Sequence, residues 1–297
     1  MPSLKDIRLR IQSIISTRQI TSAMKMVSAA KLRKTQDAII KLRPYVNKLQ
    51  EIMSEVTSTI SEDIEISYIK PRPLNKILIV LVTSNRGLCG AFNSNLIRQL
   101  QVYIKEQYSE LYQNGNVHLY CIGKKGYDYL KNKPFKIIKY QTEAIETVTY
   151  EKSCELANEL INLYEKESYG RIEFFYNRFK NAAVQIISKE NYLPVVPVVE
   201  ESKNTKKQKY LKNYIFEPNE TEILSEILPI SLRSQVYKIL LDSITAEHGA
   251  RMTAMHKATD NATEMLYELR LSYNKARQAA ITKEILEIVS GANALKG

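Results

Sequence analysis

Hydrophobic residues near the carboxyl end of the chain recur at alternating spacings of three and four. From residue 255 onward the repeating positions are Met255, Ala258, Ala262, Met265, Leu269, Ser272, Ala276 and Ala279. This rhythm is the heptad seam of a left-handed coiled coil. The surrounding stretch, residues 220–290, contains one glycine (Gly249) and one proline (Pro229) in otherwise helix-forming sequence. It therefore predicts a single helix that reaches on the order of 100 Å.

The first part of the chain predicts a second long helix. Residues 3–43 contain neither glycine nor proline and are rich in residues that helices favour or tolerate. Pro44 should kink this helix, which we expect to continue to about residue 58. The apolar stripe begins as Leu4, Ile7, Ile11 and Ile14, shifts to Ile20, Ala23, Val27 and Ala30, and resumes at Leu32, Ile39 and Leu42. We therefore expect the seam of this helix to drift.

Short β-branched runs alternate with helical patterns in the middle of the chain, which is typical of an α/β layer domain. The predicted strands are 76–82, 117–122, 136–140, 171–176 and 184–188, and the predicted helices are 94–112, 124–131 and 150–167. The sequence thus divides into a coiled-coil shaft of residues 1–58 and 220–297, an α/β domain of residues 75–200, and connecting segments 59–74 and 201–219. A helix about three times longer than such a domain must protrude from it, so its apolar stripe needs a partner.

Positive charge is concentrated in the first helix. The chain of 297 residues has a net charge of +11, and residues 1–43 hold ten Lys or Arg against two Asp, a balance of +8. Such a helix could meet nucleic acid, an anionic membrane surface or an acidic protein surface. The segment 202–212, with five lysines, predicts a solvated loop, with lipid head groups or an acidic subunit as alternative contacts.

Membrane insertion, export and disulfide bonding are not expected. The longest apolar run, Ile77–Val82, has six residues, against the roughly twenty that cross a bilayer. The amino terminus carries no pattern of a signal or transit peptide. Three scattered cysteines, Cys89, Cys121 and Cys154, indicate reduced, mostly buried thiols rather than a disulfide framework or a metal site.

The loop after the first predicted strand, residues 83–95, carries Gly87 and Gly90. A strand, a glycine loop and a helix amino terminus can bind an anion, but the phosphate-binding motifs GxGxxG and GxxxxGK[ST] are both missing. We expect the two glycines to supply positive φ angles or a close helix approach, and Asn93 or Ser94 to cap the next helix. The three histidines stand apart, and His248 and His256 are expected to face solvent or a partner. We therefore expect no catalytic residue, cofactor or metal site.

Three blocks of sequence resemble the gamma subunit of F-type ATP synthases. They are residues 8–36 (RLRIQSIISTRQITSAMKMVSAAKLRKTQ), residues 83–93 (TSNRGLCGAFN) and residues 258–295 (ATDNATEMLYELRLSYNKARQAAITKEILEIVSGANAL). The resemblance covers essentially the whole chain. Asn85 stands where an acidic residue is common, which should weaken only a capping or loop interaction. Gly249 stands where alanine is frequent and should soften the helix locally, and His256 with Lys257 replaces a more acidic pair.

The resemblance implies an antiparallel coiled coil of the two terminal helices joined to a Rossmann-like α/β domain. The chain would be the non-catalytic rotor shaft that couples ion flow to ATP synthesis or hydrolysis. Its implied partners are three alpha and three beta subunits, an epsilon subunit and the membrane c-ring, through which alone it would meet the membrane. Its implied location is the cytoplasmic face of a bacterial inner membrane, and it would hold no cofactor and bind no nucleic acid.

The resemblance also implies partner contacts at five positions. Met24 and Lys25 in the first helix, and Arg277, Gln278 and Thr282 in the last, match positions that meet the beta subunits. From the residues alone, an exposed polar helix face is the favoured explanation of Arg277 and Gln278.

Two other functions remain open at this stage. The first is a basic coiled-coil protein that binds nucleic acid, although no aromatic residue precedes Tyr45 to stack on bases. The second is an enzyme of the Rossmann type that uses the loop with Gly87 and Gly90, although that loop lacks the phosphate-binding lysine.

Overall fold

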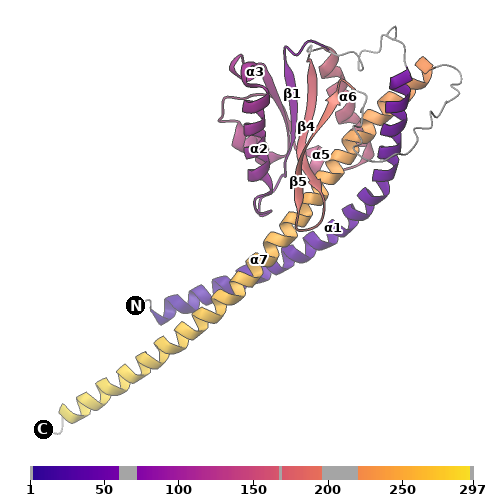
Figure 1. Cartoon of the computed structure of the whole chain (residues 1–297). Coiled ribbons are helices and arrows are strands. Elements are labelled where there is room, and N and C mark those ends of the chain that lie inside the picture. Colours follow the sequence, from indigo (N-terminus) through magenta and orange to yellow (C-terminus); the bar gives the residue numbers. More distant parts are fainter. Residues whose placement is uncertain (1–2, 60–71, 167–168, 196–219, 295–297) are drawn as a thin grey trace, which may run out of the picture. The chain divides into compact units, whose positions relative to one another are not determined.

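The computed structural model describes residues 3–59, 72–166, 169–195 and 220–294 (Figure 1). The lysine-rich segment 202–212 and most of the two predicted connecting segments lie outside these residues. The chain divides into two compact units: residues 1–30 with 251–297, here called the helix unit, and residues 31–250, here called the sheet unit. The predicted boundaries between shaft, domain and connections stay a prediction.

Both predicted long helices are confirmed. Helix α1 spans Leu4–Thr59 and helix α7 spans Glu220–Ala294. Pro44 and Pro229 lie inside these helices without ending them. Helix α1 bends in its second half, the half that contains Pro44 (Figure 1), as expected where a proline removes a helical hydrogen bond.

The sheet unit is built on a mixed five-stranded sheet with the order β3-β2-β1-β4-β5. The strands are β1 (Ile77–Val82), β2 (Val117–Ile122), β3 (Lys136–Gln141), β4 (Arg171–Phe179) and β5 (Gln185–Leu193). The first four run parallel, and β5 returns antiparallel to β4 as a hairpin. This is the α/β domain that the alternating pattern predicts.

Five shorter helices connect the strands. They are α2 (Phe92–Gln107), α3 (Ser109–Gln113), α4 (Lys124–Leu130), α5 (Glu143–Glu146) and α6 (Tyr150–Lys166). The predicted helix 94–112 is two helices, and the four-residue α5 was not predicted because a single helical turn leaves no periodic pattern.

The sheet separates two hydrophobic cores. Side chains of alternate residues in β1 point to opposite faces, and every residue of this strand is buried. One core joins Ile77, Ile79 and Leu81 to the apolar side of α2. The other joins Leu78, Val80 and Val82 to α6 and to residues 228–240 of α7. The long helix α7 is therefore part of the core of the α/β domain.

Helix α1 contributes one face to the sheet unit. Its buried residues there are spaced seven apart: Leu32, Ile39, Val46 and Met53. Ile39 clusters with Leu241 and Ile244 of α7, and Met53 joins the core that contains α6. This seven-residue spacing keeps the contacting side chains on one side of a helix whose neighbour lies alongside.

Gly249 of α7 marks a close approach between the helix and the turn of the β4–β5 hairpin. A Cβ atom at this position would lie 3.1 Å from the carbonyl oxygen of Ala182 and 3.2 Å from its Cα. The turn itself is tied by the side chain of Asn181, which accepts hydrogen bonds from the backbone N–H groups of Ala183 and Val184. The glycine thus gives the hairpin room to lie on the helix. The sequence predicted only that Gly249 softens the helix locally and did not predict this contact.

We predict that Gly249→Val destabilises the full chain by roughly 1–3 kcal/mol, because the added methyl groups push the Ala182 backbone away. Urea-induced unfolding followed by circular dichroism measures the loss. Gly291→Val is the matched control in the same helix, since a Cβ there meets no atom within 4 Å. Equal stability of the two variants would contradict the close-approach explanation.

Candidate functional site

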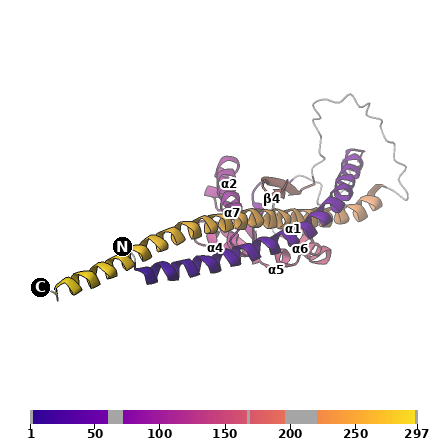
Figure 2. The ribbon, with the colours of Figure 1, turned by 90° about the horizontal axis from the view of Figure 1, so that it is seen from below.

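The helix unit consists of the first part of α1 and the last part of α7, which lie side by side (Figure 2). Ile7, Thr21 and Ser28 of α1 are buried. Leu4, Ile11, Ile14, Arg18 and Lys25 are half-buried between them. Together these residues keep the alternating spacing of three and four. The hydroxyl oxygens of Thr21 and Thr259 lie 2.9 Å apart, at hydrogen-bond distance, and fix the register of the two helices.

The expected drift of the α1 seam is wrong. Ile20 and Val27 are 60% and 57% exposed, and Ala23 and Ala30 are exposed as well. The contacting face continues through Arg18, Thr21, Lys25 and Ser28 because helix pairing, not local hydropathy, sets which positions meet the neighbour. As a result, polar residues line the seam from Arg18 to Ser28, while Ile20 and Val27 face outward.

The α7 seam is shifted by one residue at alternate positions. Met255 and Ala262 are buried, and Ala258, Leu269 and Ala276 are half-buried, as predicted. Met265, however, is 49% exposed, whereas Leu266 is 3% exposed. The same exchange recurs one and two heptads later, because Ser272 and Ala279 are exposed while Tyr273 and Ala280 are half-buried. From Ala262 onward the observed positions still alternate at spacings of four and three, so the heptad is kept and only its second seam position moves by one residue.

The five predicted contact residues fall into two clusters. Met24 and Lys25 are half-buried on α1, close to the residue Thr21 that meets Thr259. Arg277, Gln278 and Thr282 are exposed on α7, and the Thr282 hydroxyl donates to the carbonyl oxygen of Gln278 at 2.9 Å. Arg277 lies 18 residues beyond Thr259, or about 27 Å along a helix. The two clusters therefore lie at different positions along the length of the helix unit.

Apolar side chains are exposed along the helix unit. On α1 they include Leu9, Ile20, Met26 and Val27. On α7 the residues from 281 to 293 are all exposed, although they include Ile281, Ile285, Leu286, Ile288 and Val289. A helix that exposes so many large apolar residues is typical of a surface that a partner covers. The sequence offered a signal for these residues, since they follow the last position of the seam.

Positive charge accompanies the apolar surface on α1. Residues 3–30 hold five Lys or Arg, namely Lys5, Arg8, Arg10, Arg18 and Lys25, against Asp6 alone. Their net charge of +4 favours a partner that carries acidic residues. The helix unit thus combines an uncovered apolar surface with a surplus of positive charge on α1.

The loop after β1 has the geometry that the sequence predicted for one of its two glycines. Gly90 adopts a positive φ of 60°, as expected, but the other left-handed residue is Leu88, with φ 62°, and not Gly87. Neither Asn93 nor Ser94 caps α2, whose N-cap residue is Ala91. Instead the Asn93 side chain accepts a hydrogen bond from Ser84 N and donates one to Ser84 Oγ. These two bonds join the beginning of the loop to its end.

Asn85 holds the same loop to two neighbouring segments. Its Oδ1 accepts a hydrogen bond from Lys124 N at 3.1 Å, and its Nδ2 donates to the carbonyl oxygen of Thr142 at 3.0 Å. A carboxylate could accept the first bond but could not donate the second. The amide at this position therefore adds a contact instead of weakening one.

The remaining candidate chemistry is structural. Cys89, Cys121 and Cys154 carry free thiols. His248 is buried within the chain, so the expectation that it faces solvent or a partner is wrong, whereas His256 is exposed beside Asp260. Within the described ranges, no group of three or more His, Cys, Asp or Glu side chains is arranged to hold a metal ion. None of the helices in the described part of the chain has the length and hydrophobicity needed to cross a membrane.

Comparison with known proteins decides the family. The family model described as ATP synthase matches residues 3–295. The chain is 48% identical over 297 residues to the ATP synthase gamma chain of Flavobacterium psychrophilum, and 43% identical over 298 residues to that of Geobacter metallireducens, with full coverage of both chains in each case. The chain belongs to the ATP synthase gamma-chain family. The nucleic-acid-binding alternative receives no support from these matches.

Solved structures agree with this fold. The chain is similar to a rotor chain of the mitochondrial ATP synthase of Euglena gracilis, with a TM-score of 0.64, 22% identity, and coverage of 94% of this chain and 98% of that one. It is also similar to a central-stalk chain of the Tetrahymena thermophila mitochondrial ATP synthase, with a TM-score of 0.57 and 23% identity, covering 80% and 99%. Two long helices attached to an α/β domain are thus the fold of gamma chains.

The seam of the helix unit can be tested with two adjacent residues. We predict that Leu266→Ala lowers the free energy of unfolding of this unit by about 2 kcal/mol, because it removes a buried side chain. Met265→Ala should change it by less than about 0.5 kcal/mol, as an exposed substitution. Hydrogen exchange of the α7 backbone amides in the full chain measures both. A larger effect of Met265→Ala would restore the register that the sequence predicted.

Proposed function

We propose that this member of the gamma-chain family is the central rotor shaft of an F-type ATP synthase and carries no catalytic residue itself. The observation that carries the proposal is the exposed apolar end of α7, residues 281–293, in a chain whose family is that of ATP synthase gamma chains. The apolar side chains of such a helix end need a protein surface that covers them, and three alpha and three beta subunits would provide that surface. ATP chemistry would take place in those subunits.

The shaft would act through contacts that differ between its sides. A ligand or partner changes a conformational equilibrium only through its different affinity for the two states. Along α1 one side presents Arg18, Thr21 and Lys25 to the seam, while another exposes Ile20 and Val27. An asymmetric surface of this kind would offer each of three equivalent catalytic subunits a different contact, and turning the shaft would pass these contacts from one subunit to the next.

The two clusters of predicted contact residues would have different roles. Met24 and Lys25, which are half-buried on α1, would meet acidic segments of the beta subunits, where ion pairs that reach solvent are individually weak and permit sliding. Arg277, Gln278 and Thr282 would form directional bonds nearer the exposed end of α7. A guanidinium fork and a side-chain amide both suit a carboxylate or carbonyl acceptor on one beta subunit at a time.

Further partners would complete the assembly. We assign the epsilon subunit and the membrane c-ring as further partners, and the c-ring as the only route by which the chain meets the membrane. The location would be the cytoplasmic face of a bacterial inner membrane. The bacterial relatives and the fold shared with rotor chains support this assignment.

Purification from membranes tests the proposed function directly. A tag on the full-length chain should bring down two larger nucleotide-binding subunits, each in threefold molar excess over the tagged chain. The same tag on an unrelated cytoplasmic protein is the control. Recovery of the tagged chain as a monomer, free of both subunits, would overturn the proposal.

The α7 cluster can be tested in the same complex. We predict that Arg277→Ala together with Gln278→Ala lowers coupled ATP synthesis in reconstituted vesicles about tenfold, which corresponds to roughly 1.4 kcal/mol of lost transition-state stabilisation. Circular dichroism should show an unchanged helix content, because both side chains are exposed.

The matched control for this variant is Lys275→Ala. Lys275 is an exposed cation of the same helix, about 200° around the helix axis from Arg277. It should retain synthesis. If the double variant synthesises ATP at the wild-type rate, Arg277 and Gln278 do not contact a catalytic subunit.

A further inference from the structure

One face of α7 is tied to the β4–β5 hairpin at three levels. Lys238, Asp242 and Gly249 are separated by four and seven residues, so they lie within about 40° of one another around the helix axis. All three positions belong to the sheet unit. Each meets the hairpin directly or through one residue of α1. The ties span 11 residues, or about 16 Å of helix.

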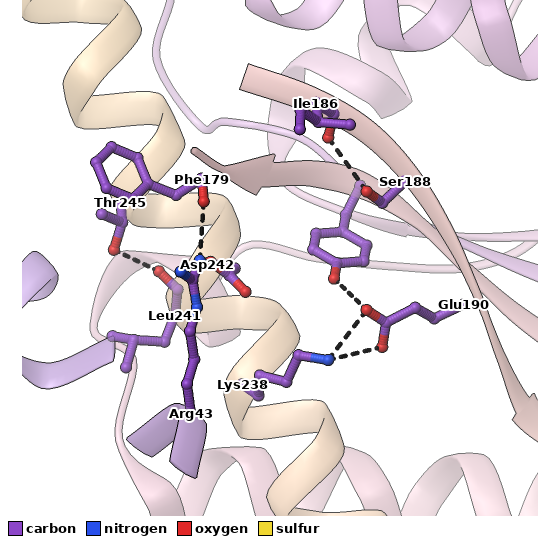
Figure 3. Close-up of polar contacts among 10 residues, drawn as sticks. Arg43, Phe179, Ile186, Ser188, Glu190, Lys238, Leu241, Asp242 and Thr245 are labelled. Carbon is purple, nitrogen blue, oxygen red and sulfur yellow. Dashed lines mark hydrogen bonds and ion pairs between the residues drawn. The ribbon is translucent and has the colours of Figure 1, made fainter. Parts of the chain in front are cut away.

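The central tie is a single guanidinium nitrogen that joins three elements. Nη2 of Arg43, from α1, donates to Oδ1 of Asp242 at 2.6 Å and to the carbonyl oxygen of Phe179 at 2.8 Å (Figure 3). Phe179 is the last residue of β4. The Asp242 side chain is 0% exposed and that of Arg43 is 37% exposed. The Arg43 guanidinium therefore joins α7, α1 and the end of β4.

The second tie lies one helical turn away. Lys238 Nζ donates to both carboxylate oxygens of Glu190, at 3.1 and 3.2 Å (Figure 3). Glu190 lies in β5 and also accepts a hydrogen bond from the hydroxyl of Tyr176 in β4. Burial, together with the neighbouring Glu190 charge, raises the pKa of Tyr176, so the phenol keeps the proton that it donates. This tie joins α7 to both strands of the hairpin.

The third tie is steric. The backbone of Ala182, in the turn of the hairpin, lies against Gly249 with no space for a side chain. Contact at this position blocks movement of the turn toward the helix, while the two ion pairs hold the strands beside it. The hairpin is thus held at its turn, at the end of β4 beside the turn, and within both strands at Tyr176 and Glu190.

These polar ties are not explained by stability alone. Burial raises the pKa of Asp242, and Arg43 opposes that rise without reversing it, so the ionised carboxylate is costly at this position. Apolar residues of similar size often stabilise a core as well as a buried ion pair does. Hydrophobic contact is non-directional and permits sliding, whereas a hydrogen-bonded ion pair fixes distance and angle. What the ties add is resistance to movement of the hairpin along or around α7.

We propose that Arg43, Asp242, Lys238 and Glu190 lock the α/β domain to α7 so that domain and helix turn as one body under torque. The inference rests on the proposed rotor function. In that function torque passes between the α/β domain and the two long helices, and the β4–β5 hairpin is where the sheet meets both of them. The four residues are positioning residues, since they contact neither nucleotide nor ion.

The test compares loaded with unloaded operation of the holoenzyme. Membranes carrying Arg43→Met or Asp242→Asn are assayed for ATP hydrolysis with a protonophore, which removes the load, and for ATP-driven proton pumping against a gradient. We expect hydrolysis within about twofold of wild type and a fall of at least about threefold in protons pumped per ATP hydrolysed, because removing one partner breaks the buried pair. Lys238→Met should lower the same ratio.

Three further variants distinguish the loss of the lock from a general loss of protein stability. Arg43→Lys keeps a cation and should restore the pumping ratio. Lys41→Met makes the same change of charge at an exposed residue of α1 and should leave the ratio unchanged. The double variant Arg43→Met/Asp242→Asn buries no unpaired carboxylate, so it should melt at a higher temperature than Arg43→Met and still pump poorly.

The outcomes distinguish this inference from the proposed function. If the wild-type chain isolates without the larger subunits, the rotor function itself fails. If the wild-type enzyme pumps and both the Arg43→Met enzyme and the double variant keep its ratio of protons to ATP, the lock is overturned while the rotor function stands. An equal loss of hydrolysis and pumping leaves the ratio unchanged and overturns the lock in the same way.

Discussion

The structure depends on one stretch of α7 that is buried on every side. All residues from Ile239 to Gly249 are buried, yet they include polar side chains such as Asp242, Thr245 and Glu247. Buried polar groups must find partners inside the protein. Asp242 finds Arg43, and the Thr245 hydroxyl donates to the carbonyl oxygen of Leu241. The hydrogen bonds of Arg43 to Asp242 and to Phe179 fix how α1 and the hairpin lie on the helix.

The same helix ends in the opposite environment. Beyond Ala280 every described side chain of α7 is exposed, including several large apolar ones. A helix that is buried all round in one segment and exposed all round in another needs two different kinds of neighbour. The first kind is supplied by the chain itself, through the sheet, α1 and the hairpin. The second must come from other subunits, which is why this chain makes physical sense only as part of an assembly.

Much of the fold could be predicted from the sequence, because the signals were local. Runs such as Ile77–Val82 contain enough β-branched residues to define a strand without knowledge of its neighbours. The absence of helix breakers predicted both long helices. Short elements such as α5 and the register of the seam depend on tertiary contacts. Met265 and Leu266 are equally apolar in sequence, and only the pairing with α1 decides which of them is buried.

The candidate site was predictable only in part. Family resemblance pointed to Lys25 and Arg277, but composition could not reveal that the α1 seam is polar or that Ile20 faces outward. Gly249 and Asn85 were seen as departures from a pattern, whereas their roles depend on Ala182 and Thr142, which are distant in sequence. Asp242 gave no signal at all, because a lone acidic residue in a helical pattern normally indicates a solvated face.

The small residues at the centre of the helix unit have a mechanical consequence. Ser28 and Ala262 are buried in the seam, and side chains of this size let two helix axes approach toward the lower end of the usual 8–10 Å range. A thinner helix pair sweeps out less volume as it rotates, so the subunits that surround it can lie closer to its axis. Where the seam is formed by such small residues, the pair trades cohesion between the two helices for a narrow cross-section.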